Sequence, residues 1–256
     1  MDESNLNGRK TFKVVLAIPN EGMTKPEAYD NHSLMMLHLG ILQERSLNQS
    51  VTPDGAIFEF YHFTAGRLLT PAAREALSDH ALEQKMDYML MIDDDMICPI
   101  DLFERLYAHD VDIVAPLAFT RNPPHLAVIY QCEKGWSPSS KNEYFKNHYV
   151  RNYPENTLVR CDAVGFGAAL IKMDVLKKMP KPYFMSTCGT GEDVLFCYNA
   201  GKSGAKVYMD TATKLGHLSH PMVIDEEYAK WWWAAMEGKD TKKQFGPIRQ
   251  YQEASS

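Results

Sequence analysis

The segment 88–98, "YMLMIDDDMIC", constrains the fold most strongly, because an apolar run leads directly into three consecutive aspartates. A run of Tyr, Met, Leu, Met and Ile without polar alternation is typical of a strand that is covered on both faces. Adjacent carboxylates repel each other, and burying one costs free energy unless a positive group lies nearby. We therefore expect a central strand whose carboxyl end lies inside a cleft that supplies positive charge.

A divalent cation accounts for the three aspartates better than a helix cap does. The alternative is a solvated turn in which one aspartate caps the helix that Pro99 opens, but three carboxylates exceed what one cap needs. Mg²⁺ and Mn²⁺ bind carboxylates together with substrate phosphates. Side chains two residues apart in an extended segment point the same way, so Asp93 and Asp95 are expected to converge. A metal bound to a diphosphate would relieve their repulsion.

Short apolar, β-rich runs alternate with helical patterns through the first half of the chain. The expected strands cover 12–18, 56–63, 87–92 and 111–119, and the expected helices cover 31–45, 70–84 and 99–110. Thr70 is expected as an N-cap and Pro71 as the first helical residue. This alternation predicts an α/β fold with a mostly parallel sheet flanked by helices. Ligands bind such sheets at the carboxyl ends of strands, so Pro19, Asn20 and Glu21 are expected near the aspartates.

The second half of the chain is expected to be less regular. The pattern predicts a strand over 125–131, a mobile, irregular segment over 132–156, strands and a short helix over 157–179, a helix over 191–204, a strand over 205–210 and a helical tail from 222. Trp136, Tyr144, Phe145 and Tyr149 give the irregular segment several aromatic side chains.

Composition excludes several classes of protein. The net charge of −6 and pI near 5.8 argue against a long nucleic acid as the main partner. The five cysteines include no C-x-x-C pair, which argues against a zinc cluster or a disulfide framework and favours a reduced setting. The polar start "MDESNLNGRK" lacks a secretory signal, and no apolar run reaches the length of a membrane span. We therefore expect a cytoplasmic protein, in the host cytoplasm if a virus encodes it.

An apolar strand that ends in D-x-D, early in an α/β chain, resembles the GT-A-fold glycosyltransferases of the family-2-like type. The opening strand and loop "VVLAIPNEG" (14–22), the segment "CDAVGFGAALIKM" (161–173), the helix start "GEDVLFCYNAGKSG" (191–204) and the following "TKLGHLSH" (213–220) resemble the same family, in the same order. The segment 111–130 resembles compact members, several of them encoded by viruses of bacteria. The resemblance implies a GT-A fold for the whole chain.

The resemblance also implies a role for each candidate residue. The donor nucleotide would be bound by Pro19, Asn20, Glu21, Arg74, Asp93, Asp94, Arg121 and Gly167. The metal would be held by Asp95, Asp93 and His217, with His220 as a weaker candidate; an imidazole ligand favours Mn²⁺ over Mg²⁺. Asp193 would act as the general base, with Glu192 as the alternative.

The function implied is metal-dependent transfer of a sugar from a nucleoside diphosphate sugar to an acceptor hydroxyl, with inversion. A retaining transferase, a sugar-nucleotide nucleotidyltransferase, a metal-dependent phosphohydrolase and a non-catalytic nucleotide-sugar-binding protein stay open. The acceptor is a glycan, a lipid-linked sugar, a protein or a modified DNA base. One domain is expected over 1–256, with a donor half at 11–120, an acceptor half at 121–220 and a tail at 221–256.

The tail contains three consecutive tryptophans, Trp231 to Trp233. On a helix they would spread over roughly 200°, so they cannot all face one core. Either the helix packs on the domain with one tryptophan partly exposed, or it covers another surface, such as a second subunit.

Overall fold

The computed structural model describes residues 5–6, 8–20, 24–137, 142–187, 190–219 and 222–237. The helices are α1 (Pro26–Asn48), α2 (Thr70–Glu83), α3 (Leu102–Tyr107), α4 (Met173–Lys178), α5 (Glu192–Lys202) and α6 (Glu226–Met236). The strands are β1 (Asn5–Leu6), β2 (Arg9–Asn20), β3 (Ile57–Gly66), β4 (Tyr88–Ile92), β5 (Met96–Ile97), β6 (Ile113–Leu117), β7 (Ile129–Ser137), β8 (Asn142–Tyr149), β9 (Leu158–Cys161), β10 (Ala163–Val164), β11 (Ala168–Lys172), β12 (Val207–Lys214), β13 (Gly216–Ser219) and β14 (Met222–Ile224).

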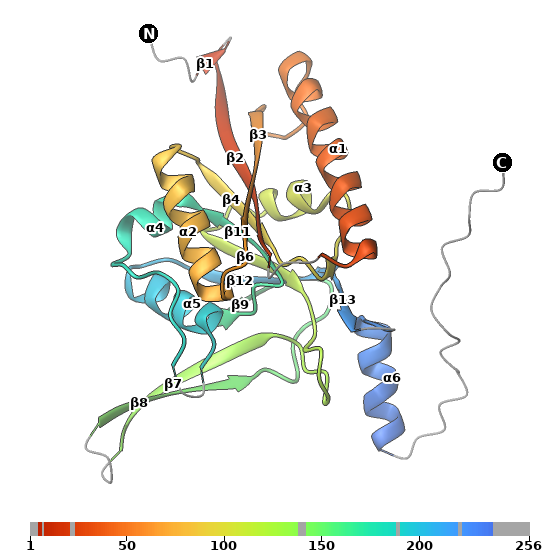
Figure 1. The fold of residues 1–256 in the computed structure, drawn as a ribbon, viewed down its shortest axis with the longest axis vertical. Helices are drawn as coiled ribbons and strands as arrows, with labels where there is room; N and C mark the ends of the chain where they lie inside the picture. The colour runs from red at the N-terminus through yellow and green to blue at the C-terminus, as the bar shows by residue number, and fades with distance from the viewer. Residues whose placement is uncertain are drawn as a thin grey trace, which may run out of the picture.

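A mixed sheet of eight strands forms the centre of the molecule (Figure 1). Its order is β1-β2-β4-β11-β6-β12-β9, and β3 also pairs with β2. β2, β3, β4, β6 and β12 run in one direction, while β11 runs antiparallel between β4 and β6. The expectation of a mostly parallel sheet in an α/β fold is therefore confirmed. The carboxyl ends of β2, β4, β6 and β12 lie at the same edge of the sheet.

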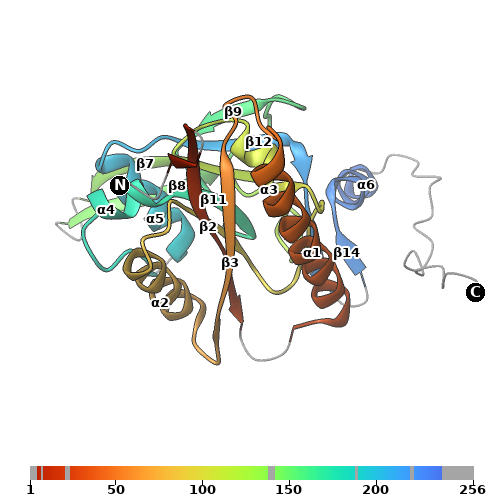
Figure 2. The same cartoon turned by 90° about the horizontal axis from the view of Figure 1, so that it is seen from above.

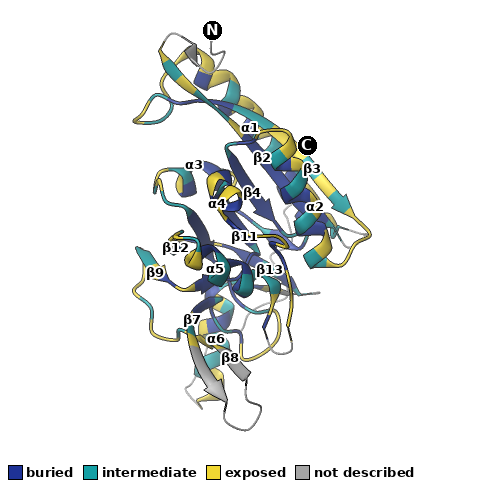
Figure 3. Ribbon diagram, turned by 90° about the vertical axis from the view of Figure 1, so that its left-hand side faces the viewer, coloured by how far each residue is buried: buried dark blue, intermediate teal, exposed yellow. Residues whose placement is uncertain are grey.

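Helices cover both faces of this sheet (Figures 1 and 2). Side chains alternate along β4, so that Met89 and Met91 pack on the side of α2, α4 and α5, whereas Leu90 and Ile92 pack on the side of α1 and α3. All four are fully buried, as the dark central strands of Figure 3 illustrate. Each such side chain contributes about 1.5–3 kcal/mol by leaving water. Burial on both faces explains why the strand reads as an uninterrupted apolar run.

Two local expectations about the helices are corrected. α2 begins at Thr70 with Leu69 as its N-cap residue, so Thr70 is not the cap and Pro71 lies one residue deeper in the first turn. Proline is tolerated there because the first helical N–H groups have no partner within the helix. α3 is shorter than its pattern predicts and covers only Leu102–Tyr107.

The segment 132–156 is not an irregular loop, and the strand expected over 125–131 begins only at Ile129. β7 and β8 form a long antiparallel hairpin, from Tyr130 opposite Tyr149 to Ser137 opposite Asn142, which projects from the body (Figure 1). The sequence of this hairpin mixes polar and apolar residues without a regular alternation, so no strand pattern marks it, and backbone hydrogen bonds define its strands. The ring of Tyr149 lies 4.7 Å from that of Tyr130; the side chains at 134–145, including Trp136, Tyr144 and Phe145, lie outside the described set.

None of the helices in the described ranges combines the length and apolar character that crossing a bilayer requires.

Candidate functional site

Three strand ends bring together Asp95, Arg121 and His217, which we call the Asp95 cluster. Asp95 follows β4, Arg121 follows β6, and His217 lies in β13, immediately after β12. β13 pairs with β5, which sets His217 opposite Met96. Nη2 of Arg121 donates to Oδ2 of Asp95, and Nε of Arg121 lies 3.3 Å from Nε2 of His217. That same histidine nitrogen lies 3.3 Å from Oδ2 of Asp95.

A backbone carbonyl sets the orientation of the His217 ring. Nδ1 of His217 lies 3.0 Å from the carbonyl oxygen of Phe119, which can only accept, so Nδ1 carries the proton. In the neutral imidazole, Nε2 then carries a lone pair that accepts from Nε of Arg121, whereas in the protonated ring the same nitrogen donates to Oδ2 of Asp95. Burial raises the pKa of Asp95, but the hydrogen bond with His217 and the charges of His217 and Arg121 outweigh it and lower that pKa. Asp95 is therefore a carboxylate at neutral pH.

The donor set of the Asp95 cluster suits a divalent cation. A carboxylate oxygen and an imidazole nitrogen converge within 3.3 Å, and both are ligands that Mn²⁺ accepts. The Phe119 carbonyl orients the imidazole, as outer-shell partners do in metal sites. In this structure the guanidinium of Arg121 supplies positive charge to both atoms. Asp95 and His217 thus fit as a two-residue protein contribution to a metal site.

Asp93 does not join that pair, contrary to the expected metal triad of Asp93, Asp95 and His217. Its Oδ1 accepts a hydrogen bond from Arg74 at 2.7 Å, on the other side of the turn. The chain turns at Asp94 and Asp95, with the Met96 N–H bonded to the Asp93 carbonyl, so the alternation of an extended segment does not continue. Among the residues described, no group of three or more His, Cys, Asp or Glu side chains is placed to hold a metal ion.

A second group, the Arg74 cluster, consists of Arg74, Asp93 and Glu192. Arg74 extends from α2 and is only 2% exposed. Its Nη1 donates to Glu192 Oε1 at 2.6 Å, and its Nη2 donates to Asp93 Oδ1 at 2.7 Å and to the Phe166 carbonyl at 3.1 Å. Burial raises the pKa of Asp93 to about 6, and Arg74 opposes this rise. Arg74 is thus an internal counter-ion for two carboxylates, and its contact with a donor diphosphate stays a prediction.

Asp193 lies next to Glu192 in the first turn of α5, where acidic residues are stabilised by the helix dipole. Its Oδ1 accepts a hydrogen bond from the N–H of Val194 at 2.7 Å. Burial raises the pKa of Asp193, and the charge of Arg74 opposes this. A Cβ on Gly191 would lie 2.8 Å from Oδ1 of Asp193, so the N-cap glycine leaves room for the carboxylate. A carboxylate with a raised pKa is a stronger base than an exposed one.

The other predicted donor residues are distributed around this edge of the sheet. Pro19 and Asn20 end β2, and Asn20 donates from Nδ2 to Thr24 Oγ1 at 2.8 Å. Asp94 is half-buried in the turn after β4. Gly167 accepts the Asp93 N–H at 2.9 Å, and a Cβ there would lie 3.0 Å from Cε of Met96. Gly167 thus leaves room for the side chain of Met96, and its contact with a donor nucleotide stays a prediction. Glu21 and His220 lie outside the described residues.

Lys25 belongs to the site but was not among the predicted residues. It precedes α1, and its Nζ donates to the Leu218 carbonyl at 2.6 Å, within β13. Its charge is one of those that lower the pKa of Asp95. The sequence feature that could have predicted Lys25 is its position in the loop after β2, because ligands bind at this edge of such sheets.

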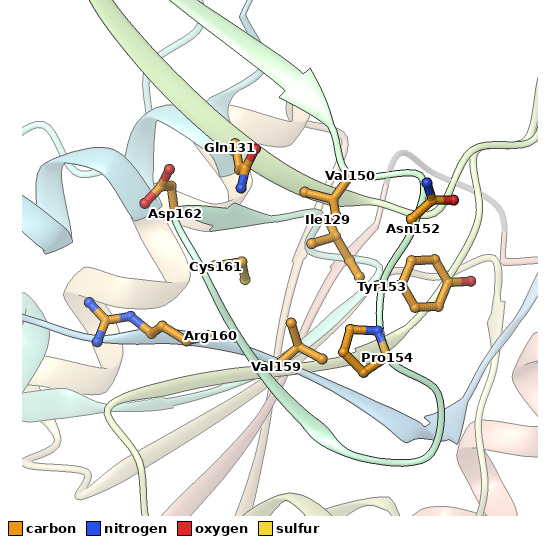
Figure 4. A pocket seen from close by; sticks show the side chains of 10 residues that line it. All are labelled: Ile129, Gln131, Val150, Asn152, Tyr153, Pro154, Val159, Arg160, Cys161 and Asp162. Atoms are coloured by element: carbon orange, nitrogen blue, oxygen red, sulfur yellow. The ribbon is translucent and has the colours of Figure 1, made fainter.

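A hollow of about 250 Å³ lies elsewhere, between β7, β9 and the segment that precedes β9 (Figure 4). Its lining includes Ile129, Gln131, Tyr153, Arg160 and Asp162 and none of the predicted site residues. This hollow therefore does not mark the acidic strand ends.

Comparison with known proteins places the chain by its fold. No family model and no curated protein sequence matches it. Among solved structures, A197 from STIV matches with a TM-score of 0.53 at 17% identity, covering 84% of this chain and 91% of that one. GalNAc-T7, crystallised with UDP, GalNAc and Mn²⁺, matches with a TM-score of 0.51 at 12% identity, covering 93% of this chain and 52% of that one, so this chain spans about half of the GalNAc-T7 chain. The neighbours include GT-A glycosyltransferases, and the chain has this fold.

Proposed function

We propose that this protein transfers a sugar from a nucleoside diphosphate sugar to an acceptor hydroxyl, with Asp193 as the general base. The observation that carries the proposal is the convergence of Asp95, Arg121 and His217 where three strands end. Burial is the main cause that raises the pKa of Asp93, and the charges of Asp95 and Asp193 add to the rise, so both carboxylates act on Asp93. Asp93 therefore lies within electrostatic reach of both the proposed diphosphate side and the proposed base.

Asp95 and His217 are proposed to hold a divalent ion, for which Mn²⁺ suits the imidazole ligand. Such an ion supplies Lewis-acid stabilisation of the negative charge on a departing diphosphate. The structural neighbour GalNAc-T7 was crystallised with UDP and Mn²⁺, which supports this choice. With only two protein ligands, the remaining positions suit water and phosphate oxygens.

Arg121 and Lys25 are proposed to bind the phosphate oxygens. The Arg121 side chain is 48% exposed and offers a planar set of donors that matches phosphate. Among the described residues, Lys25 donates one of its three ammonium hydrogens to the Leu218 carbonyl. Both charges lie beside Asp95, so the diphosphate would be neutralised where it binds.

Asp193 is proposed to take the proton from the acceptor hydroxyl. The hydroxyl oxygen attacks the anomeric carbon as the bond from that carbon to the diphosphate oxygen breaks. The proton ends on the Asp193 carboxylate, and the bonding electrons leave with the diphosphate. A single displacement of this kind inverts the anomeric configuration.

The proposal predicts that one nucleoside diphosphate stabilises the protein in a manganese-dependent way. Thermal unfolding is measured with a panel of nucleoside diphosphates, each with and without Mn²⁺. Binding to the native state at 100 times the dissociation constant adds about 2.7 kcal/mol of stability, which raises the melting temperature measurably. If neither Mn²⁺ nor any of the diphosphates shifts the transition, the proposed function is wrong.

Replacing Asp95 with asparagine should abolish that manganese-dependent shift. Loss of an outer-shell partner typically weakens metal binding 10–100-fold, and loss of a direct ligand should weaken it at least as much. Asp101→Asn is the matched control, because Asp101 is six residues away and pairs with Arg105 on the surface. An Asp95→Asn protein that binds Mn²⁺ and the diphosphate like the Asp101→Asn protein would contradict the assignment.

Replacing Arg121 with alanine should change the two affinities in opposite directions. The guanidinium of Arg121 bonds to Oδ2 of Asp95 and Nε2 of His217, the two atoms that would bind a metal ion. Its removal should therefore tighten Mn²⁺ binding by roughly tenfold, the equivalent of one charged hydrogen bond. Affinity for the diphosphate in the presence of Mn²⁺ should fall. Isothermal titration with Mn²⁺ alone, then with the diphosphate, measures both; parallel weakening of the two would refute this role.

A further inference from the structure

Helix α6 directs two of its tryptophans at the loop that carries Arg121, which we call the Arg121 loop (residues 120–126). Nε1 of Trp233 donates to the carbonyl oxygen of Pro124 at 2.6 Å. The Trp233 ring also meets the ring of Phe119 edge-on, with centroids 5.9 Å apart. Phe119 is the residue whose carbonyl orients His217. One side chain of α6 therefore contacts both the Arg121 loop and the support of the His217 ring.

His125 forms the second contact. Its ring lies edge-on to Tyr228 at 5.2 Å and to Trp232 at 5.5 Å, so two aromatic rings of α6 enclose it. The residue is 3% exposed and has a φ of 51°, a conformation that a non-glycine residue keeps only where its surroundings determine it. Nδ1 of His125 lies 3.1 Å from the Thr120 carbonyl, which links the end of the loop to its beginning.

The Arg121 loop is closed at its base, so its contacts with α6 act on Arg121 directly. The Thr120 N–H donates to the Leu126 carbonyl at 2.9 Å, and the Leu126 N–H donates to Thr120 Oγ1 at 3.0 Å. Arg121 is the next residue after Thr120, and its half-exposed side chain depends on the loop for its position. Inside the loop, the Asn122 carbonyl accepts from the His125 N–H at 3.2 Å and from Thr120 Oγ1 at 3.0 Å, so the position of His125 is linked to the residue next to Arg121.

Helix α6 is itself attached to the strand that leads to His217. Asp225 caps the helix, accepting the Tyr228 N–H at 2.8 Å. Glu226 pairs with Lys214, the last residue of β12, and with Lys230 at 3.3 Å. Lys230 also pairs with Glu155 at 2.8 Å. These contacts fix α6 beside the site, below β13 in Figure 1.

We propose that α6 positions the Asp95 cluster and that Trp233 is a positioning residue for Arg121. The proposal rests on the proposed function and deepens it. It makes α6 responsible for the position of Arg121, which is proposed to bind the diphosphate. It also gives Trp232 and Trp233 an intramolecular role. Trp233 touches neither the substrate nor the reacting atoms in this scheme; it acts by holding the loop from which Arg121 extends.

The first test measures opening of the Arg121 loop and does not depend on the reaction. Trypsin is added to the native full-length chain, and the rate of cleavage between Arg121 and Asn122 is followed by mass spectrometry. Trp233→Phe keeps an aromatic ring but removes the N–H, so cleavage should become several-fold to about tenfold faster, tracking the population of the open loop. Trp231→Phe is the matched control, since a phenyl ring at this position keeps the packing against Tyr228, and cleavage should stay at the wild-type rate. Equal cleavage rates in the wild-type protein and both variants would overturn the proposal.

The second test measures whether Trp233 acts through Arg121. Binding of inorganic pyrophosphate is titrated in the presence of saturating Mn²⁺. Trp233→Phe should weaken pyrophosphate binding by at most roughly tenfold, the equivalent of one hydrogen bond, and the double variant Trp233→Phe/Arg121→Ala should bind no more weakly than Arg121→Ala alone. Full additivity of the two losses would overturn the positioning role. If the wild-type protein binds no pyrophosphate, the proposed function fails, while the trypsin result still decides whether α6 holds the loop.

Discussion

Replacing Asp193 with asparagine should lower kcat by about 10²–10⁴-fold, the usual contribution of a general base to the rate. Binding of the nucleoside diphosphate should stay nearly unchanged. The amide has the size of the carboxyl group but cannot accept the proton of the acceptor hydroxyl. The measurement is single-turnover transfer with the donor that the thermal-shift panel identifies, together with a titration of its diphosphate. Asp95→Asn should give the opposite pattern, since it acts on binding of the metal and diphosphate.

Glu192→Gln serves as the matched control for this prediction. Glu192 is the neighbouring carboxylate, and its Oε1 accepts from Arg74 at 2.6 Å, so it is engaged in the Arg74 cluster. We expect a smaller loss of kcat from Glu192→Gln than from Asp193→Asn. If Glu192→Gln is the more damaging change, the two residues exchange roles, and Glu192 becomes the base.

The same assignment has a consequence for pH dependence. Burial raises the pKa of Asp193 above its ordinary value, and the base acts only when it is deprotonated. Activity should therefore be present above the raised pKa and fall as the pH decreases through it, with a midpoint higher than that of an exposed aspartate. A profile of kcat against pH measures this midpoint. A midpoint at the pKa of an exposed carboxyl group would argue against a buried Asp193 as the base.

Replacing Arg74 with methionine should destabilise the protein by about 3–5 kcal/mol, because removing one partner of a buried ionic group leaves the others uncompensated. Arg74 is 2% exposed, and its guanidinium bonds to Asp93, Glu192 and the Phe166 carbonyl. The free energy of unfolding is measured by guanidinium denaturation. Neutralising the partners in the triple variant Arg74→Met/Asp93→Asn/Glu192→Gln should recover most of the loss.

Arg105→Met provides the control for the Arg74 prediction. Arg105 forms an exposed pair with Asp101 at 2.8 Å, and pairs of this kind contribute about 0–1 kcal/mol. If Arg74→Met costs no more than Arg105→Met, Arg74 is not the counter-ion that keeps Asp93 and Glu192 in place. An Arg74 that binds substrate would instead lower diphosphate affinity without a large loss of stability.

The central strand and the carboxylates at its end could be predicted from the sequence because both are local features. Tyr88 to Ile92 have no polar alternation, and only a strand buried on both faces accommodates such a run. Glu192 and Asp193 fall at a helix start for a reason that is equally local, the dipole of the helix. The resemblance to GT-A glycosyltransferases, drawn from motif order, agrees with the fold that the structure has.

Other features depend on contacts that local patterns do not contain. The hairpin of β7 and β8 is held by backbone pairing, so its sequence carried no periodic signal. Asp93 and Asp95 separate because the chain turns between them, and the rule for extended segments assumes that it does not. Lys25 could not be predicted as a site residue, because the number of residues between Lys25 and Asp95 does not determine their separation in space.

The sequence by itself determined an α/β sheet with acidic residues at the end of its central strand, since burial and alternation are properties of neighbouring residues. Only the tertiary structure decided which positive group meets each carboxylate. Arg74 reaches Asp93 from α2, whereas Arg121 and His217 reach Asp95 from the ends of other strands. These pairings join residues far apart in the chain, and they form because a buried carboxylate must have a positive partner, whichever segment the fold brings beside it.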